Sequence, residues 1–580
     1  MILKYMGKKE WVIAALCFLC IIIQIYFDLR IPEYMSDMTE VIAAGESSDK
    51  VIGYGTDMLV CAAGSMIVSL GGSAFATLSA VSLCRHLRTR IFRRVCEFSP
   101  EDVSKFSVES LITRCSNDLI QVQNFLSQAM QVVIKAPLLS AWALVKISGA
   151  EWEWTAATAA GVLILVIIIS AVIYLTRPYY KRVPILTDRL NQASLDHMTG
   201  VRAVRAYNAE RFQEQKFKEA SDDMMWNSIH IWNHASLMPA VSSGMNNFLT
   251  LVIFWTGITL IAASSGSSHN VVLFSNMIVF TSYASQIIGA FMSLSFLIQQ
   301  STRALASTKR VQEIVDYEPV ISDGRFNGDG PEPGTVEFNH VDFTYPGSKV
   351  PALTDVSFKV GRGQTMAVIG ATGSGKSTLV RLILRRYYAT GGTVSVDGTD
   401  VREYKGRELE SRISYVPQNI VILTGSIAEN VDLGAENGGH SKEEIERALD
   451  IAQAGDFVSE LPGGLDFEVT EGGGNLSGGQ KQRISIARAV CKGADIMLLD
   501  DPFSALDFAT DKKLRAALNE GCPGVTRILV TQRVGTVMDA DLILVLDEGQ
   551  VVGFGRHEDL LRECSIYREI ATSQMVEGTI

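Results

Sequence analysis

The stretch of this sequence that most directly suggests chemistry is GATGSGKST, residues 370–378. It follows the apolar run TMAVI and precedes LVRLILRRYY, so a glycine-rich loop is expected between a strand and a helix. There the glycines let backbone N–H groups surround phosphate oxygens, and the helix N-terminus favours negative charge. Lys376 is expected to reach the β- and γ-phosphates of ATP, and Ser377 to ligate Mg²⁺. The predicted nucleotide-binding residues of this loop are Gly370, Ala371, Thr372, Gly373, Ser374, Gly375, Lys376, Ser377 and Thr378.

A second motif, IMLLDDPFSALD, is acidic and spans residues 496–507. Four apolar residues lead directly into Asp500 and Asp501, a pattern typical of a buried strand that carries a carboxylate at its end. An acidic strand end alone means little. Beside a phosphate-binding loop, however, Asp500 is expected to help hold the Mg²⁺ ion.

The stretch NLSGGQKQRISIARAV begins 25 residues before Asp500 and resembles the signature motif of the ATP-binding-cassette family. In that family the motif caps the γ-phosphate of a nucleotide bound to the opposite cassette, again with a hydroxyl and backbone donors at a helix N-terminus. The resemblance gives this role to Ser477, Gly478, Gly479 and Gln480. It also implies that Tyr345 in DFTYPG stacks on adenine and that Gln418 in YVPQ contacts Mg²⁺. Ser377, Gln418 and Asp500 are thus the expected metal ligands.

Two residues depart from the family pattern at the catalytic end of the site. Active members carry Glu after the metal-binding Asp, where this sequence has Asp501, and a switch His where this sequence has Gln532. Aspartate is one methylene shorter, and an error of about 1 Å in position can cost roughly a hundredfold in rate. A glutamine amide cannot carry a proton as imidazole can. The site is therefore predicted to bind ATP and to hydrolyse it weakly, whereas the intact signature motif would complete the active site of an unlike partner.

The first half of the chain must place these motifs at a membrane. Apolar residues make up 47% of the 580 residues and gather in the first 300. An apolar run of about 20 residues can cross a bilayer as a helix. Six such runs are present, at residues 11–31, 54–83, 126–148, 155–176, 237–263 and 271–298.

Basic residues predict the orientation of these six spans. They precede the first span and follow the second and fourth, whereas the connections 36–50, 149–154 and 264–270 hold one Lys and no Arg. By the positive-inside rule both termini are cytoplasmic, in a multi-pass protein of the plasma (cytoplasmic) membrane. The connections 84–125 and 177–236 have helical periodicity and are expected to extend the spanning helices into the cytosol.

The expected fold class is an all-α six-helix membrane domain with long cytoplasmic helical extensions, followed by an α/β P-loop nucleotide-binding domain. The boundaries are 1–320 for the membrane domain, 321–334 for a Gly/Pro/Asp-rich linker and 335–580 for the nucleotide-binding domain. The membrane half resembles exporters with six spans per subunit. Within that resemblance, 110–125 and 200–217 correspond to the two cytoplasmic loops that couple to the cassette, the short helix of the first pressing on it.

These features predict one half of a heterodimeric ATP-driven exporter, similar to the degenerate-site subunit of bacterial multidrug-type exporters. Its expected partners are an unlike half-transporter with intact catalytic Glu and His, the lipid bilayer, and a small lipophilic or amphipathic substrate. An ATP-gated regulatory membrane subunit and an importer built on the exporter fold remain alternatives. The substrate itself is not predicted, and the candidate cavity residues Gln24, Trp142, Trp255, Tyr283 and Gln286 are more typical of helix packing.

Charge and cysteine content exclude other classes of protein. The net charge of −11 gives no indication of a nucleic-acid partner. The nine cysteines are scattered, so neither a disulfide framework nor a Cys/His metal site is expected from their spacing. Lys135, within the third span, is costly in hydrocarbon and is expected to face protein, water or the inner interface.

Overall fold

A computed structural model of the chain describes residues 2–147, 152–263, 267–433 and 439–577. The chain forms two compact units. One comprises Met1–Cys96 and Val108–Tyr317, and the other comprises Glu97–Ser107 and Glu318–Ile580. Parts of two connections used in the orientation argument, 149–154 and 264–270, lie outside the described residues.

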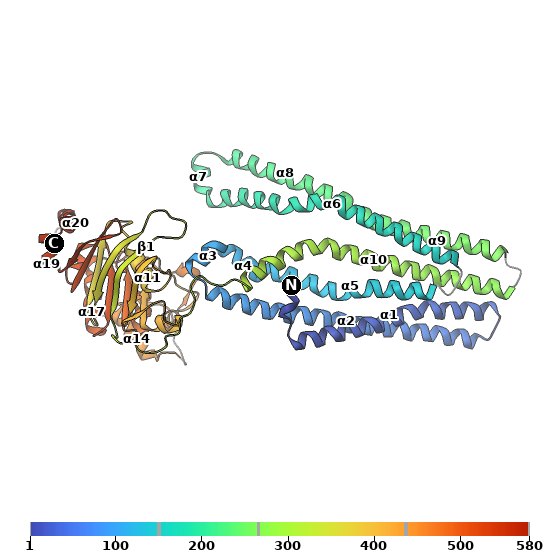
Figure 1. The fold of residues 1–580 in the computed structure, drawn as a ribbon, viewed down its shortest axis with the longest axis horizontal. Helices are drawn as coiled ribbons and strands as arrows, with labels where there is room; N and C mark the ends of the chain where they lie inside the picture. Colours follow the sequence, from blue (N-terminus) through green and yellow to red (C-terminus); the bar gives the residue numbers. More distant parts are fainter. Residues whose placement is uncertain (1, 148–151, 264–266, 434–438, 578–580) are drawn as a thin grey trace. The chain divides into compact units, whose positions relative to one another are not determined.

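The first unit is built from long helices (Figure 1). Among the described residues, six helical segments are long and apolar enough to cross a membrane, which confirms the six predicted spans. Several continue far beyond the apolar run, as the sequence predicted. The helices are α1 (Lys8–Ala43), α2 (Ser48–Cys96), α4 (Val108–Thr113), α5 (Leu119–Ile147), α6 (Trp152–Thr199), α7 (Val201–Ala206), α8 (Glu210–Ala235), α9 (Leu237–Ala263) and α10 (Ser267–Val315), with a π-helical turn at Arg114–Asp118 between α4 and α5.

Small residues allow these helices to approach closely. A Cβ atom added to Gly64 of α2 would lie 3.1 Å from the Phe27 ring of α1. On α9, a Cβ at Gly257 would overlap the side chain of Met277 on α10. The glycines thus bring helix backbones together where bulkier residues would hold them apart, which is how helices associate in lipid.

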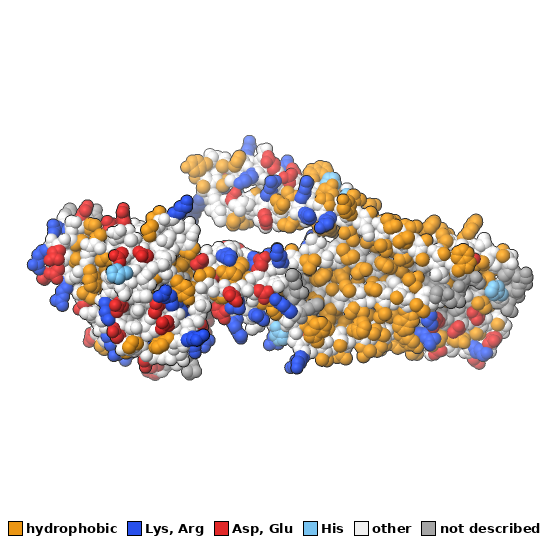
Figure 2. Space-filling view, in the orientation of Figure 1, with side chains coloured by type: hydrophobic (Ala, Val, Ile, Leu, Met, Phe, Trp, Pro, Cys, Tyr) orange, Lys and Arg blue, Asp and Glu red, His pale blue; other side chains and the backbone are white. Residues whose placement is uncertain are grey.

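On the face that Figure 2 shows, apolar side chains cover most of the spanning helices. Leu59, Ile67, Leu251 and Trp255 are among the exposed ones. Charged side chains gather instead along α6, α7 and α8 beyond the spans (Figure 2). An apolar surface over the spans with charged residues beyond its edge is what is expected of a protein solvated by lipid.

A short helix between α2 and α4 groups with the second unit. This helix, α3 (Pro100–Phe106), begins with Ser99 as its N-cap in a capping box with Asp102, and Asp102 Oδ1 accepts a hydrogen bond from Val320 N at 3.3 Å. The predicted first coupling loop, 110–125, contains α4, the π-helical turn and the start of α5, all in the first unit, and its coupling role stays a prediction. The sequence signal for α3 was Ser-Pro-Glu-Asp, an N-cap followed by proline at the first helical position.

The second unit has two principal sheets. The antiparallel sheet has the order β2-β1-β4-β5, and the six-stranded sheet has the order β12-β11-β3-β10-β9-β6, in which all neighbours except β11 and β12 are parallel. The bounds are β1 (Val336–Phe343), β2 (Leu353–Val360), β3 (Thr365–Gly370), β4 (Gly391–Val396), β5 (Thr399–Asp400), β6 (Ile413–Val416), β9 (Ile496–Asp500), β10 (Thr526–Val530), β11 (Leu542–Asp547) and β12 (Gln550–Gly555), with a separate pair β7 (Gly425–Ser426) and β8 (Glu468–Val469).

Helices alternate with these strands, which confirms the predicted α/β domain. They are α11 (Lys376–Ile383), α12 (Gly406–Arg412), α13 (Ile427–Val431), α14 (Lys442–Ile451), α15 (Gly455–Glu460), α16 (Gly478–Cys491), α17 (Phe508–Gly521), α18 (Val534–Val537), α19 (His557–Glu563) and α20 (Ser565–Glu577). Before β1, the stretch 321–334 packs against the domain: Gly324 and Phe326 donate backbone hydrogen bonds to the carbonyls of Tyr404 and Glu403.

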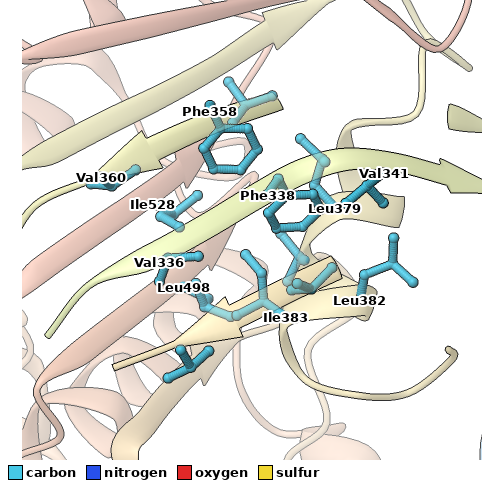
Figure 3. Close-up of a cluster of buried hydrophobic side chains, with 14 of the residues drawn as sticks. Val336, Phe338, Val341, Phe358, Val360, Leu379, Leu382, Ile383, Leu498 and Ile528 are labelled. Carbon is cyan, nitrogen blue, oxygen red and sulfur yellow. The ribbon is translucent and has the colours of Figure 1, made fainter. Parts of the chain in front are cut away.

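The main core of this unit lies between the two sheets and includes α11 (Figure 3). Phe338 and Phe358 stack with ring centroids 4.6 Å apart. Leu379, Leu382 and Ile383 of α11 enter the same cluster. The helix that follows the glycine-rich loop is therefore fixed by apolar packing along its length, so the loop at its N-terminus has a rigid support.

We expect Phe338→Ala to destabilise the second unit by about 3–5 kcal/mol, the usual cost of deleting a buried phenylalanine ring. Phe338 is 2% exposed, whereas Phe554 on the edge strand β12 is 44% exposed, so Phe554→Ala is the matched control. Scanning calorimetry of the full chain measures both, with the relevant transition recognised by its upward shift in ATP. Equal effects of the two changes would show that the cluster is not the core.

Candidate functional site

The parallel strands bring the predicted motifs to one edge of the sheet. In the register of these strands Val530 of β10 pairs with Asp500 of β9 and with Val368 of β3, and β6 pairs with β9 through Val416 and Leu499. The strands therefore end close to the same level. The loops after β3, β9, β10 and β6 carry the glycine-rich motif, the acidic pair, Gln532 and Gln418, so all four motifs meet at the carboxyl edge.

A cavity of about 320 Å³ lies at this edge. Most of the predicted nucleotide residues line it, and they do so together with Ala352, Arg381, Val530 and Thr531. The predicted residues among its lining are Tyr345, Thr372, Gly373, Gly375, Lys376, Ser377, Thr378, Gln418, Asp500, Asp501 and Gln532. Gly370, Ala371 and Ser374 of the same loop are not among the lining residues.

Two glycines of the glycine-rich loop adopt backbone conformations that residues with a side chain rarely adopt. Gly373 and Gly375 have φ of +89° and +99°, in the left-handed region. Lys376 is buried, and its Nζ donates to the carbonyl oxygens of Gly370 (2.9 Å) and Ala371 (2.7 Å). Burial lowers the pKa of Lys376, and the nearby carboxylates of Asp500 and Asp501 oppose that shift. The buried hydroxyl of Ser374 has no hydrogen-bond partner among the described residues, as suits a loop that receives phosphate oxygens.

Ser377 and Asp500 form the oxygen pair expected of a magnesium site. Ser377 Oγ donates to Asp500 Oδ1 at 3.0 Å, although 123 residues separate them in the sequence. Burial raises the pKa of Asp500, with Ser377, Arg381 and Lys376 acting in the opposite direction. Hydroxyl and carboxylate oxygens are the ligands that Mg²⁺ uses beside nucleotide phosphates, so these side chains fit the ion. Gln418 faces the same cavity from the loop after β6.

Tyr345 is held in place by neighbours that the sequence analysis did not identify. Its ring packs edge-on against Phe343 and Tyr387, with centroids 4.8 and 5.3 Å away. Its hydroxyl lies 3.0 Å from Thr378 Oγ1 and accepts a hydrogen bond from Arg381 Nη1 at 3.0 Å. Arg381 lies four residues after Ser377 and three after Thr378 on α11, and this helical spacing, which puts the three on one face, was the available signal for its position.

Asp501 has a fixed backbone. Its φ is +51°, uncommon for a residue other than glycine. Its N–H donates to the Val530 carbonyl at 2.8 Å, and its own carbonyl accepts from Gln482 Nε2 at 3.2 Å and Ser504 Oγ at 3.1 Å. Burial raises the pKa of the Asp501 carboxyl, partly offset by Arg533 and Lys376. These backbone hydrogen bonds fix the Cα position of Asp501 and so limit how far its carboxylate can reach.

The segment around Gln532 is tied to the C-terminal helix α20. Gln574 Nε2 donates to the Gln532 carbonyl at 2.6 Å, and Gln574 Oε1 accepts from Val534 N at 2.7 Å. One side chain thus holds the backbone on both sides of Arg533. This contact joins residues 42 positions apart, and no sequence pattern indicated it.

The signature residues occupy a different place from the nucleotide cavity. Ser477 caps α16: its Oγ accepts from Gln480 N at 3.3 Å, and its N–H donates to Gln480 Oε1 at 2.8 Å. Ser477 and Gly478 are exposed, and none of Ser477, Gly478, Gly479 and Gln480 lines the cavity that the described residues form. Within this chain the motif forms an exposed helix N-terminus.

A second cavity, of about 650 Å³, lies within the membrane unit. Gln24, Gln286 and Lys135 line it, but of the other candidates Trp142, Trp255 and Tyr283 do not. Tyr283 is buried and donates its hydroxyl to the Leu29 carbonyl at 3.1 Å, while Trp255 is exposed on the apolar outer surface. The sequence analysis missed Asp28, a carboxylate inside the first span that pairs with Lys135.

All nine cysteines are free thiols in the structure. The fold nevertheless gathers Asp432, His440 and Cys491, whose ligand atoms lie within 4.8 Å of one another. His440 Nδ1 is 2.6 Å from Asp432 Oδ1, so two of the three groups already form a hydrogen-bonded pair.

Six apolar helical segments joined to a P-loop domain with an exposed LSGGQ helix define a half-transporter of the ATP-binding-cassette type. Two family models match the chain, the ABC transporter transmembrane region at residues 14–291 and the ABC transporter at 353–504. The chain is 33% identical over 95% of its length to an uncharacterised ABC transporter ATP-binding protein of Mycobacterium tuberculosis, covering 94% of that protein. The chain therefore belongs to the ABC transporter family and is a multi-pass membrane protein with an ATP-hydrolysing domain.

Two further comparisons extend this result. The chain is 29% identical, over 88% of its length and 84% of the relative, to the ATP-dependent lipid A-core flippase of Pseudomonas fluorescens. Its structure matches that of a bacterial Atm1-family ABC exporter with ATP bound at a TM-score of 0.80, with 22% identity over 98% of each chain. The fold is thus that of an ABC exporter.

We expect Gly375→Ala to impair ATP binding and lower the stability of the second unit more than Gly373→Ala does. Both positions have left-handed backbones, and both changes incur strain of roughly 1–3 kcal/mol. Only at Gly375 would the added Cβ also lie 2.7 Å from the Ala352 carbonyl oxygen; at Gly373 no described atom lies within 4 Å. Titration with a fluorescent ATP analogue and calorimetry of both variants test this difference, and equal losses would contradict the clash.

Proposed function

We propose that this chain is one subunit of a heterodimeric ATP-driven exporter whose own ATP site is catalytically weak. The observation that carries the proposal is the position of two side chains: Asp501 and Gln532 both line the nucleotide cavity beside Lys376. The rest of the pocket keeps the residues that bind ATP and Mg²⁺. Binding without efficient hydrolysis is the behaviour that this combination supports.

Because the backbone of Asp501 is fixed, the shorter reach of its side chain should lower the rate of hydrolysis. A flexible loop could move forward to compensate for the missing methylene. Here three hydrogen bonds, with Val530, Gln482 and Ser504, hold the main chain of residue 501. The carboxylate therefore falls about 1 Å short of the place where a glutamate would position water, which is worth roughly a hundredfold in rate.

Gln532 removes a second catalytic contribution. Its amide can donate one hydrogen bond to a phosphate oxygen, but it stays neutral and cannot supply a protonated imidazole. The hydrogen bonds of Gln574 to the backbone at residues 532 and 534 keep this segment in place. The expected loss of catalysis therefore comes from the amide side chain and not from a displaced backbone. Asp501 and Gln532 would act on the same γ-phosphate. Two such replacements at one site are better explained by selection for slow hydrolysis than by chance.

The intact signature motif is the argument for an unlike partner. Ser477 and the N-terminus of α16 are exposed and stand apart from this chain's own cavity, so they are available to a nucleotide on another cassette. In a homodimer they would cap two weak sites. With a partner that has the catalytic Glu and His, they would complete one efficient site, and this explains why the motif is intact.

For the transported compound we propose a small lipophilic or amphipathic molecule, moved outward across the plasma membrane with both termini in the cytoplasm. A membrane cavity of about 650 Å³ with mixed polar and apolar lining supports transport over a purely regulatory, ATP-gated role. A flippase among the relatives supports a lipid-like substrate. Export and import are distinguished by the direction of substrate movement in sealed vesicles.

We expect the purified chain, without a partner, to bind Mg-ATP and to hydrolyse it slowly. Asp501→Glu with Gln532→His should then raise its ATPase by about two orders of magnitude, because each copy supplies an intact signature motif to the other. Adding Ser477→Arg should abolish the gain, and Ser411→Arg, at an exposed serine on α12, is the control. Brisk turnover by the unmodified chain would contradict the weak-site proposal.

In the two-chain complex the two sites should respond oppositely. Ser477→Arg should remove most of the ATPase activity, since it blocks the partner's efficient site. Asp501→Ala should change it by less than about twofold, because the site it damages contributes little. ATPase and substrate flux are measured together in reconstituted vesicles. Loss of activity with Asp501→Ala alone would show that this chain's site does the work.

A further inference from the structure

The cavity in the membrane unit contains an ion pair between helices. It is lined from α1, α2, α5 and α10, and its polar lining includes Gln24, Asp28, Lys135 and Gln286. Lys135 Nζ on α5 lies 3.2 Å from Asp28 Oδ2 on α1. Both lie within apolar spans, where a single charge is expensive and a pair is tolerated.

The pair is accessible from the cavity. The side chains of Lys135 and Asp28 keep 33% and 23% of their exposure, so the pair is not sealed in the helix packing. Ser65 Oγ donates to the other carboxylate oxygen of Asp28, which orients the group. A purely structural pair would be expected in the dry interface between helices rather than on the wall of a 650 Å³ space.

A neighbouring polar atom is also unsatisfied. Gln286 Nε2 donates to the Asp28 carbonyl at 3.3 Å, which directs the amide to this wall. Its Oε1 is buried and has no hydrogen-bond partner among the described residues. A buried acceptor without a donor is costly, so this wall of the cavity has polar capacity that the protein itself does not satisfy.

We propose that this cavity binds the head group of a zwitterionic amphiphile, with the ligand's cationic group at Asp28 and its anionic group at Lys135; this assignment rests on the proposed transport function. The argument is one of charge balance. A monovalent cation or anion that paired with one member would leave the other charge uncompensated in a poorly solvated site. A zwitterion inserts between the two and leaves no net charge. The apolar lining, which includes Ile21, Ile31, Val132 and Leu139, suits the acyl part.

The test measures head-group preference in the absence of ATP, so it remains informative if transport itself fails. The full chain, with its partner if one copurifies, is titrated in neutral detergent with three pyrene-tailed lipids of identical chains. Their head groups are phosphocholine, phosphoglycerol and trimethylammonium. Energy transfer from the seven tryptophans, all within residues 11–255, reports binding.

We expect the unmodified chain to bind the phosphocholine probe roughly tenfold more tightly than either charged probe, because each charged probe can compensate only one member of the ion pair. Lys135→Met should shift the preference to the trimethylammonium probe, and Asp28→Asn to the phosphoglycerol probe. Lys146→Met, which breaks the Lys146–Glu33 pair between the same two helices but outside the cavity lining, should leave the preference unchanged. A structural pair would instead alter all three affinities alike.

The double variant Asp28→Asn with Lys135→Met keeps the site neutral and tests the proposal even if a single variant fails to fold. It should bind all three probes with nearly equal affinity. A double variant that still prefers phosphocholine would overturn the assignment, as would an unmodified chain without head-group preference. Equal changes for all probes in the single variants would also overturn it. If binding follows the expected pattern but ATP moves no lipid, the binding site stands and the transport function fails.

Discussion

The register of the parallel sheet is the constraint on which the nucleotide site depends. Val530, Asp500 and Val368 are neighbours across three strands, so the loops that follow these strands begin at one level. The 3.0 Å contact between Ser377 and Asp500 exists only in this register, since a slip by one residue would turn the carboxylate to the opposite face. Apolar packing of α11 between the sheets holds the other half of the contact. Core and site are therefore parts of a single structural arrangement.

Within that arrangement the catalytic departures are confined to side chains. The backbone N–H and carbonyl of Asp501, the carbonyl of Gln532 and the N–H of Val534 are all hydrogen-bonded, so the main chain that carries both side chains is held in place. A frame of this kind can hold nucleotide firmly. Under the proposed function, slow hydrolysis would let ATP at this site keep two cassettes together while the partner's site turns over. This subunit would then contribute by keeping ATP bound at its own site and not by hydrolysing it.

The membrane unit solves a different physical problem. Its helices cannot use the hydrophobic effect to associate in lipid, so glycine contacts such as Gly64 against Phe27 supply close packing. Polar groups are placed where they face a cavity or a partner on another helix. The pair of Asp28 and Lys135 meets both conditions, which is how two ionised groups can exist at that depth without a net charge.

The sequence by itself determined the features that depend on short stretches of chain. A run of about 20 apolar residues predicts a span, and a glycine-rich loop ending in Lys376 and Ser377 predicts phosphate binding, because each signal is complete within one segment. The six spans, their helical extensions and the α/β domain were predicted for this reason. The identities of Asp501 and Gln532 were also readable, as was the resemblance that gave them meaning.

Tertiary structure alone decided which distant residues meet. Asp28 and Lys135 are 107 positions apart, and Gln574 reaches residue 532 across 42 positions. Neither contact has a local pattern, because each depends on how helices pack or strands pair. The grouping of α3 with residues 318–580 also depends on long-range contacts, although the Ser-Pro start of the helix was visible in the sequence. Local sequence propensity determines the helices and strands, but long-range packing determines which side chains share a cavity.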